Sequence, residues 1–503
     1  MRITNTMMTN NTMRNVNKSK NTLYTAEEQM SSQKRISKPS DDPIIAIRAL
    51  SLRTSLSEVT QYLKKNVPDA ESWIKLTETS LDNVNRYLSD IYEYCNQGSS
   101  DSFTTTNRQA LMQSINQLKD SIYSEGNADY SGRYIFTGYR TDDSLTFKNE
   151  IESNVKYRIN QEFSISDINT VKYMKNSVDA NVTAATANTI ASADMPQTEE
   201  VYRMRLAYNT CSKDATPTIS LNGTPYTGNV VKLSNKEFEK LISKNGAAMN
   251  DGTIYYIHDN GELVFNKKTN QNIVNNYQTA VAADPDTKWG IKVTYQKDDF
   301  KKGDVKPEHY FECEDLTNNV KYLLGDNQDI EYTINFSQTL KVNTRAKDAI
   351  SFNIGRDIDD LLNSLDNVYN IENKIEKLKQ MKESTEFKNK QDEIESMITA
   401  ANKELDYAKN YMEGLFAKGM TQMKNYQSVL NSEIADIGSR EVRLTLAKSR
   451  LTEQESTFKD LKSKNEDLEL EEIAVNFAAA ETVYNAAIST AAKSVRQTLL
   501  DYI

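Results

Sequence analysis

The chain has 503 residues, too many for one ordinary core, and its length predicts about three domains. Its net charge of −10, dispersed along the chain, disfavours nucleic acid and anionic membranes as partners. Three widely separated cysteines exclude a disulfide framework and a cysteine metal site, and only 8 prolines and 16 glycines favour long helices.

The N-terminus, MRITNTMMTNNTMRNVNKSKNTLY, has no apolar run of the kind that a cleavable signal peptide needs. No segment of the chain approaches the 18 or more apolar residues of a membrane span. We therefore expect no membrane insertion and no conventional secretion signal. If the protein leaves the cell, another export route must carry it.

Residues 1–36 are expected to form a helix with one thin apolar stripe. Val16, Leu23 and Met30 recur every seven positions, and Met13 precedes Val16 by three. The rest of the segment is rich in Asn, Thr and Ser, which compete with helical hydrogen bonds. Such a helix is marginal alone and needs a partner helix.

The stretch RISKPSDDPIIAIRAL, residues 35–50, places two aspartates beside a proline. Paired carboxylates can serve acid–base chemistry or hold a metal, but no histidine or cysteine is near to complete such a set. Pro43 restricts Asp42 to an extended conformation and is itself suited to the first helical position. We interpret Asp42 and Pro43 as a helix-start signal, with Asp42 as the N-cap.

Two amphipathic helices follow within residues 37–140, separated at Pro68, and a third is expected near residues 108–123. Cys95 lies on the apolar face of the second helix and is interpreted as a core residue.

Residues 141–345 change to alternating patterns of apolar and polar residues, which are typical of strands. Residues 253–266 predict a hairpin, in which Asn260 and Gly261 supply two left-handed positions of a tight turn. The only histidines, His258 and His309, belong to no zinc motif and are interpreted as exposed or structural.

Helical patterning returns over residues 346–436, which are long and charged. Residues 437–503 then carry two apolar stripes that we take, with the N-terminal stripe, as assembly-interface candidates. The members of the first are seven residues apart, and those of the second form an alanine-rich face: Ile437, Leu444, Leu451 and Phe458; Ile473, Phe477, Ala480, Tyr484 and Ala487.

The predicted fold is mainly α with an inserted β-rich domain. In it the N- and C-terminal parts together form a long helical bundle and the middle forms an outer β domain. The expected divisions are an N-terminal assembly helix, the N-terminal half of the bundle, the β-rich domain, long helices returning to the bundle and a C-terminal assembly region: 1–36, 37–140, 141–345, 346–436 and 437–503.

The sequence contains no P-loop, no G-x-G-x-x-G, no G-x-S-x-G and no calcium-loop pattern. No catalytic, metal or cofactor-binding residue is therefore predicted, and the protein is not expected to be an enzyme.

Three segments carry a likeness to a known family: KRISKPSDDP at residues 34–43 after the start MRITNTMM, SGRYIFTGYRTD at 131–142, and the last 67 residues from IGSREV onward. The N-terminal segments resemble the flagellar hook-associated protein 3 family, the hook–filament junction proteins of the flagellin-like superfamily. The C-terminal segment is similar to the flagellin-type C-terminal region. The resemblance covers roughly residues 1–140 and 430–503.

This resemblance implies a structural protein that is exported unfolded through the flagellar type III apparatus, accompanied before secretion by an export chaperone. Such proteins assemble extracellularly as a ring between hook-associated protein 1 and flagellin, with their terminal helices forming the inner layers of the tube. It also implies no cofactor.

Three alternatives stay open. The chain is long for a junction protein, which leaves a filament flagellin as a competitor. A carboxylate-only glycan-active enzyme in the middle domain, or a generic intracellular coiled-coil scaffold, would also fit parts of the pattern.

Overall fold

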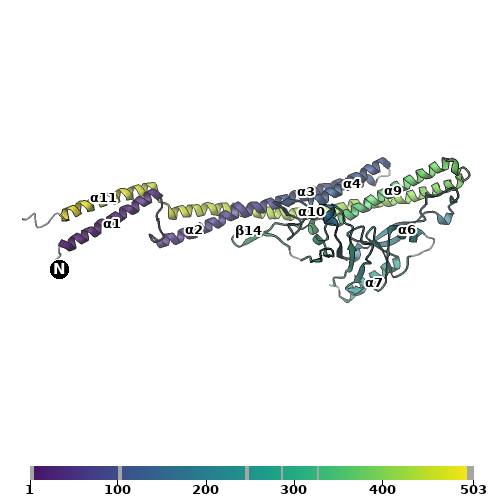
Figure 1. The fold of residues 1–503 in the computed structure, drawn as a ribbon, viewed down its shortest axis with the longest axis horizontal. Coiled ribbons are helices and arrows are strands. Elements are labelled where there is room, and N and C mark those ends of the chain that lie inside the picture. Colours follow the sequence, from purple (N-terminus) through teal and green to yellow (C-terminus); the bar gives the residue numbers. More distant parts are fainter. Residues whose placement is uncertain (1–4, 100–104, 244–248, 285–286, 326–327, 496–503) are drawn as a thin grey trace, which may run out of the picture. The chain divides into compact units, whose positions relative to one another are not determined.

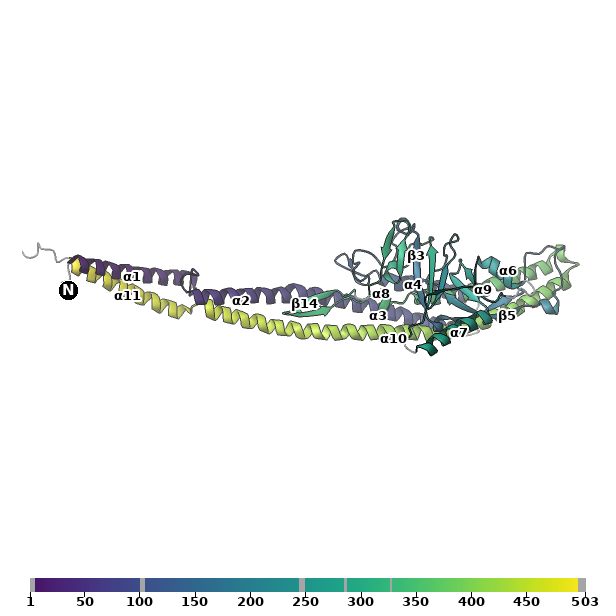
Figure 2. The same ribbon diagram turned by 90° about the horizontal axis from the view of Figure 1, so that it is seen from below.

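A computed structural model describes residues 5–99, 105–243, 249–284, 287–325 and 328–495 (Figures 1 and 2). The described chain divides into two compact units. Unit 1 holds residues up to 71, residues 332–340 and those from 441 onward; unit 2 holds the rest. The prediction of a mainly α fold with an inserted β-rich region is confirmed.

Unit 1 contains two pairs of antiparallel helices. Helix α1 (Asn5–Ser32) lies along α11 (Leu470–Val495), as Figures 1 and 2 both show. Helix α2 (Pro43–Gln61) lies along the last part of α10 (Gln391–Glu466). Ion pairs mark the antiparallel register of α10 against α2 and the helical residues that follow α2: Arg53 with Glu466, Lys64 with Glu455, and Glu71 with Lys448.

The interruption expected at Pro68 takes a different form. The chain does not leave the helix but passes through a five-residue π-helix, Tyr62–Asn66, into α3 (Val67–Gly98). Proline cannot donate a backbone hydrogen bond, and its ring crowds the carbonyl four residues earlier. A widened turn just before Pro68 lets the helix continue in spite of both effects.

A hairpin of β14 (Glu331–Asn335) and β15 (Gln338–Lys341) packs on this π-helical segment within unit 1. The Phe336 ring meets Tyr62 edge-on at 5.5 Å between centroids. Asn66 Nδ2 donates to the Thr333 carbonyl at 2.8 Å, and Tyr332 Oη donates to Asp69 Oδ2 at 3.2 Å. The hairpin thus belongs to unit 1, although it lies within residues 141–345, the segment predicted to form the β-rich domain.

Unit 2 contains four antiparallel helices: α3, α4 (Thr105–Glu125), α9 (Asn353–Glu383) and α10. Their core side chains are fully buried, among them Leu88 and Phe416. Close approach of α3 and α10 depends on small residues, since a Cβ at Gly98 would meet the Phe416 ring at 2.6 Å. Cys95 is buried here, as expected of a core residue.

The β-rich part of unit 2 holds two larger sheets. The first is five-stranded in the order β4-β5-β10-β9-β8, antiparallel except for β8 and β9. Its strands are Asn169–Lys175 (β4), Gln197–Arg205 (β5), Asn229–Leu233 (β8), Thr253–Ile257 (β9) and Glu262–Phe265 (β10).

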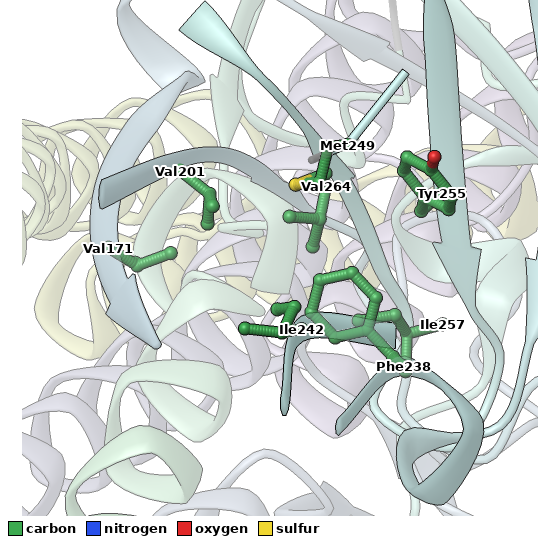
Figure 3. Close-up of a cluster of buried hydrophobic side chains, with 8 residues drawn as sticks. All are labelled: Val171, Val201, Phe238, Ile242, Met249, Tyr255, Ile257 and Val264. Atoms are coloured by element: carbon green, nitrogen blue, oxygen red, sulfur yellow. The ribbon is translucent and has the colours of Figure 1, made fainter. Parts of the chain in front are cut away.

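The core of this sheet lies between its strands and helix α6 (Asn235–Ser243), as Figure 3 shows. Phe238 and Ile242 of α6 are buried against Val201 and Val264 of the sheet. Apolar side chains of this size each contribute about 1.5–3 kcal/mol when fully buried.

The second sheet is six-stranded and antiparallel, in the order β13-β12-β3-β11-β6-β7. Its strands are Tyr157–Phe163 (β3), Thr218–Leu221 (β6), Thr224–Pro225 (β7), Ile291–Lys297 (β11), Glu312–Asp315 (β12) and Val320–Tyr322 (β13). Strands β3 and β11 show the alternating burial that their sequences predict.

Shorter elements and one longer helix complete the unit. They are Asp129–Tyr130 (β1), Arg133–Tyr134 (β2), Glu150–Ser153 (α5), Lys267–Ala283 (α7), Ala346–Ala349 (α8) and the 3₁₀ turns Ile165–Asp167, Ser192–Asp194, Pro307–His309 and Thr385–Phe387.

The hairpin predicted at residues 253–266 is present as β9 and β10, but its turn is not the tight one expected. Ile257 pairs with Glu262, so four residues form the turn, and Gly261, but not Asn260, is left-handed. The wider turn is held by the rest of the fold, because the Thr210 and Cys211 amides donate to its Asp259 and His258 carbonyls.

A buried ion network ties the five-stranded sheet to α9. Arg203 donates to Glu262 at 2.9 Å and to Asp360 at 2.7 Å, and Arg205 bonds both Asp360 and Asp357. Burial raises the pKa of Asp360, but the two guanidinium charges more than offset this and leave that pKa below its ordinary value. Arg203 and Arg205 together therefore balance the negative charges of the buried carboxylates.

No helix in the described ranges has a stretch long and apolar enough to cross a membrane.

Candidate assembly interface

The pairing of α1 with α11 brings the N-terminal stripe against the alanine-rich C-terminal face. On α11, Ile473 and Ala480 are buried, and Phe477, Tyr484 and Ala487 are half-buried. The small alanines let the two helices approach closely, as the sequence indicates.

The α1 side of this contact is thinner. Val16 and Leu23 are half-buried, whereas Met13 and Met30 are exposed. The best-buried apolar residue of α1 is Ala26, which the seven-residue spacing did not single out because it falls three positions after Leu23. A stripe this narrow covers only one side of each helix.

The polar residues of α1 are accommodated within the helix itself. Thr12, Thr22 and Thr25 donate their hydroxyls to the carbonyls four residues earlier, at 2.9–3.1 Å. This back-bonding satisfies the hydroxyls but does not strengthen the helix. The stability of α1 therefore depends on what packs against it.

Apolar side chains remain exposed on both terminal helices. On α1 and α11 they are Met7, Met8, Met13, Tyr24, Met30, Leu470, Val475, Val483 and Ile488. At a 100° step per residue, Val475 lies on the side of α11 away from Ile473 and Ala480, whereas Val483 lies on a flank of the helix, about 60–80° from them. The pair therefore keeps an outer surface with exposed apolar side chains beyond the face where its two helices meet.

The seven-residue stripe of α10 is buried along most of its length. Ile437, Leu444 and Leu451 are fully buried, and Phe458 is half-buried. The same spacing extends upstream through Leu430, Met423 and Phe416, all buried, and a longer search at the seven-residue period would have found them.

Helices α1 and α2 are joined at the level where α10 ends and α11 begins. Gln33, with φ +54°, ends α1. The Arg35 amide donates to the Glu466 carbonyl at 2.7 Å, and the Leu468 amide donates to the Gln33 carbonyl at 3.1 Å. These backbone hydrogen bonds join the loop between α1 and α2 to the loop between α10 and α11.

Side chains reinforce this joint. Arg53 forms a bidentate pair with Glu466, with both N–O distances at 2.7 Å. Lys34 pairs with Asp467. The hydrogen bond from Arg53 holds the pKa of Glu466 below its ordinary value, so this carboxylate stays charged in mildly acidic solution.

Asp42 is the N-cap of α2, and Pro43 is the first residue of that helix. Asp42 has an extended backbone, φ −147°, and its Oδ1 accepts from the Ile44 and Ile45 amides at 2.9 and 3.1 Å. Its neighbour Asp41 accepts from the Ser37 and Lys38 amides at 3.1 and 2.8 Å and thereby folds the loop. Both carboxylates bind backbone.

The two histidines belong to unit 2, and both are buried. His258 Nδ1 lies 2.9 Å from Asp259 Oδ1, and His309 Nε2 lies 3.1 Å from the Ser144 carbonyl oxygen.

Comparison with known proteins bears on the N-terminal third of the chain. Residues 3–141 match the bacterial flagellin N-terminal helical region. Over 143 residues the chain is 32% identical to flagellar hook-associated protein 3 of Escherichia coli, and over 122 residues it is 32% identical to a flagellin of Clostridium tyrobutyricum. These matches cover 28% and 24% of this chain. They span 45% and 32% of the relatives, so the chain matches less than half the length of either.

Among solved structures, flagellar hook associated protein-3 from Legionella pneumophila aligns with 82% of this chain and 97% of its own, at 12% identity and a TM-score of 0.31. The likeness of the C-terminal segment to flagellins stays a prediction. Residues 3–141 of this chain match the bacterial flagellin N-terminal helical region, and the predicted resemblance to flagellar hook-associated protein 3 is confirmed over 143 residues.

Proposed function

We propose that this protein is a structural component of the bacterial flagellum, a junction adaptor that joins hook-associated protein 1 to the flagellin filament. The observation that carries the proposal is the set of apolar side chains left exposed on the outer surface of the α1–α11 pair, Val475 and Val483 among them. The match of residues 3–141 with the bacterial flagellin N-terminal helical region supports the flagellum as the assembly to which the chain belongs.

The two terminal helices α1 and α11 pack on each other within unit 1. Helix α1 is poor in strong helix formers and covers only one face of α11. Placing the pair among copies of itself would bury the remaining apolar side chains, at about 25 cal/mol per Å² of apolar surface. Ordering of the terminal helices is then coupled to assembly.

The partners follow from this role. Copies of the chain form a ring, hook-associated protein 1 lies on one side of it and flagellin on the other. Before secretion the unfolded chain is held by a flagellar export chaperone, and it travels by type III export to the cell exterior. We assign the protein no catalytic role, since the relatives it matches are named flagellar hook-associated protein 3 and flagellin.

The test places charge on the outer face without touching a buried side chain. Val475→Asp with Val483→Asp changes two positions that are 68% and 58% exposed. Cells carrying only this variant should export the protein in normal amounts but attach few or no filaments, counted by electron microscopy, and the purified variant should fold as the wild type does. Substituting the buried Leu451 instead would confuse loss of assembly with loss of folding.

The matched control is Ile151→Asp with Leu323→Asp, two apolar residues of unit 2 that are even more exposed. Cells with the control should carry normal filaments. Normal filament numbers with the α11 variant, or an equal loss with the control, would contradict the proposal.

A filament flagellin is the second candidate, favoured by the identity shared with the Clostridium flagellin. Purified protein distinguishes the two. A junction adaptor should remain as short oligomers when seeded with filament fragments, whereas a flagellin should elongate the seeds into long filaments by itself.

A further inference from the structure

Three potential metal ligands from distant parts of the sequence meet in unit 2. Oxygen atoms of Asp143 and Glu308 and a ring nitrogen of His309 lie within 4.8 Å of one another. Glu308 and His309 belong to the 3₁₀ turn Pro307–His309, and Asp143 follows strand β2. Backbone hydrogen bonds hold the two segments together, since the Lys306 amide donates to the Leu145 carbonyl at 2.9 Å.

The Glu308 carboxylate is a buried group in need of a partner. Its side chain belongs to a residue only 7% exposed, and its Oε2 has no hydrogen-bond partner among the residues that the structure describes. A buried polar group without a hydrogen-bond partner lowers the free energy of unfolding by about 1–3 kcal/mol, and a charged group lowers it by more. Glu308 and His309 line a cavity of about 20 Å³, which is room for about one water molecule or ion.

One ring nitrogen of His309 lies beside a backbone carbonyl. Its Nε2 lies 3.1 Å from the Ser144 carbonyl oxygen, and donation there leaves the Nδ1 lone pair to coordinate a cation. Metal-bound histidines commonly donate their second ring nitrogen to a backbone carbonyl in this way. Asp143 is about one-third exposed and offers a path from solvent.

Positive groups also face the cluster and limit its affinity. Lys306 Nζ pairs with Asp143 Oδ1. Arg140 and Arg345 line the cavity, but Arg140 stacks on the Tyr322 ring at 4.0 Å and Arg345 pairs with Asp348. Lys306 is thus the cation in direct competition, and the Phe147 ring, 5.5 Å from its Nζ, can receive the ammonium if it moves.

We propose that Asp143, Glu308 and His309 bind one divalent transition-metal ion, with Zn²⁺ as the best match, and that Lys306 competes with it for Asp143. One imidazole and two carboxylates with a position left for water suit Zn²⁺, whereas Mg²⁺ prefers oxygen ligands alone. Bound metal would cross-link the segment after β2 to the turn before β12. The inference does not depend on the proposed function.

The experiment measures Zn²⁺ binding to the full-length chain, without a histidine tag, by competition with a chromophoric chelator. One Zn²⁺ should bind per chain, and Mg²⁺ should not displace it. His309→Gln should weaken binding by at least about 100-fold, because loss of a second-shell partner alone typically costs about 10- to 100-fold. His258→Gln is the matched control, since it removes the only other histidine, itself beside a carboxylate, and should change nothing.

Lys306→Met supplies a test that misfolding cannot imitate. Removing the competing ammonium should tighten Zn²⁺ binding roughly 10-fold, because a like charge near the ion is lost. Equal affinities of wild type and His309→Gln, loss of binding in His258→Gln, or no tightening in Lys306→Met would each overturn the proposal.

Discussion

The two units use the same helix, α10, in different ways. Its seven-residue stripe runs through both, from Phe416 in unit 2 to Leu451 in unit 1, and is buried throughout. In unit 2, α3 and α9 both pack on it, whereas in unit 1 α2 is its helical neighbour, and Val442 and Leu446 stay exposed. The stripe decides which side is buried, and the number of neighbours decides how much of the helix is covered.

The largest loss of stability is expected from Leu451→Asp, on the buried side of α10 in unit 1. Leu451 is fully buried, so the substitution loses its packing and places a carboxylate in an apolar contact. We expect a loss of about 4 kcal/mol or more in the free energy of unfolding, measured by urea denaturation followed by circular dichroism. Leu446→Asp, five residues earlier and exposed, should change it by no more than about 0.5 kcal/mol. Equal effects would contradict the assignment of sides.

A comparable loss is expected in unit 2 from Arg203→Leu. The substitution leaves the buried Glu262 and Asp360 carboxylates short of a partner, which typically costs about 3–5 kcal/mol. Arg158 pairs with Glu314 on the same domain but is half exposed, and Arg158→Leu should cost at most about 1 kcal/mol. Thermal unfolding of both variants checks the difference, and similar melting temperatures would show that the buried network does not hold the sheet to α9.

The smallest effect concerns the joint of unit 1 and depends on pH. Because the pKa of Glu466 is lowered in the folded chain, its contribution is complete above the unfolded value of about 4.3 and is lost as pH falls through the lower folded value. Arg53 is more than half exposed, so the contribution is about 1 kcal/mol. Melting temperatures of wild type and Glu466→Gln should differ at pH 7 and converge by about pH 3. A gap that does not change with pH would show that ionic pairing is not its cause.

Much of unit 1 could be predicted from local pattern. The Asp42 cap follows from Pro43 alone, because proline restricts the residue before it, and the α10 stripe follows from its period. Ala26 was missed because a small residue three positions from Leu23 looks unremarkable until an opposing helix lies on it. Its burial depends on α11, more than 440 residues away.

Unit 2 was less open to prediction wherever distant segments meet. The turn after Ile257 is wide because amides of Thr210 and Cys211 bond to it, which no local signal records. Asp143 and His309 are 166 residues apart, so no motif spacing could join them. The hairpin at 332–340 was predicted to be part of the β-rich domain, yet it packs on the π-helix of unit 1.

By itself the sequence determined the classes of its segments: helices where apolar residues recur at three, four and seven, strands where they alternate, and a helix start at Asp42. These depend on hydrogen bonds and side-chain directions within a few residues. Only the tertiary structure decided which faces are covered, that Arg203 compensates two carboxylates, and that Glu308 lies buried beside His309. Those outcomes depend on long-range contacts, whose energies no short stretch of sequence contains.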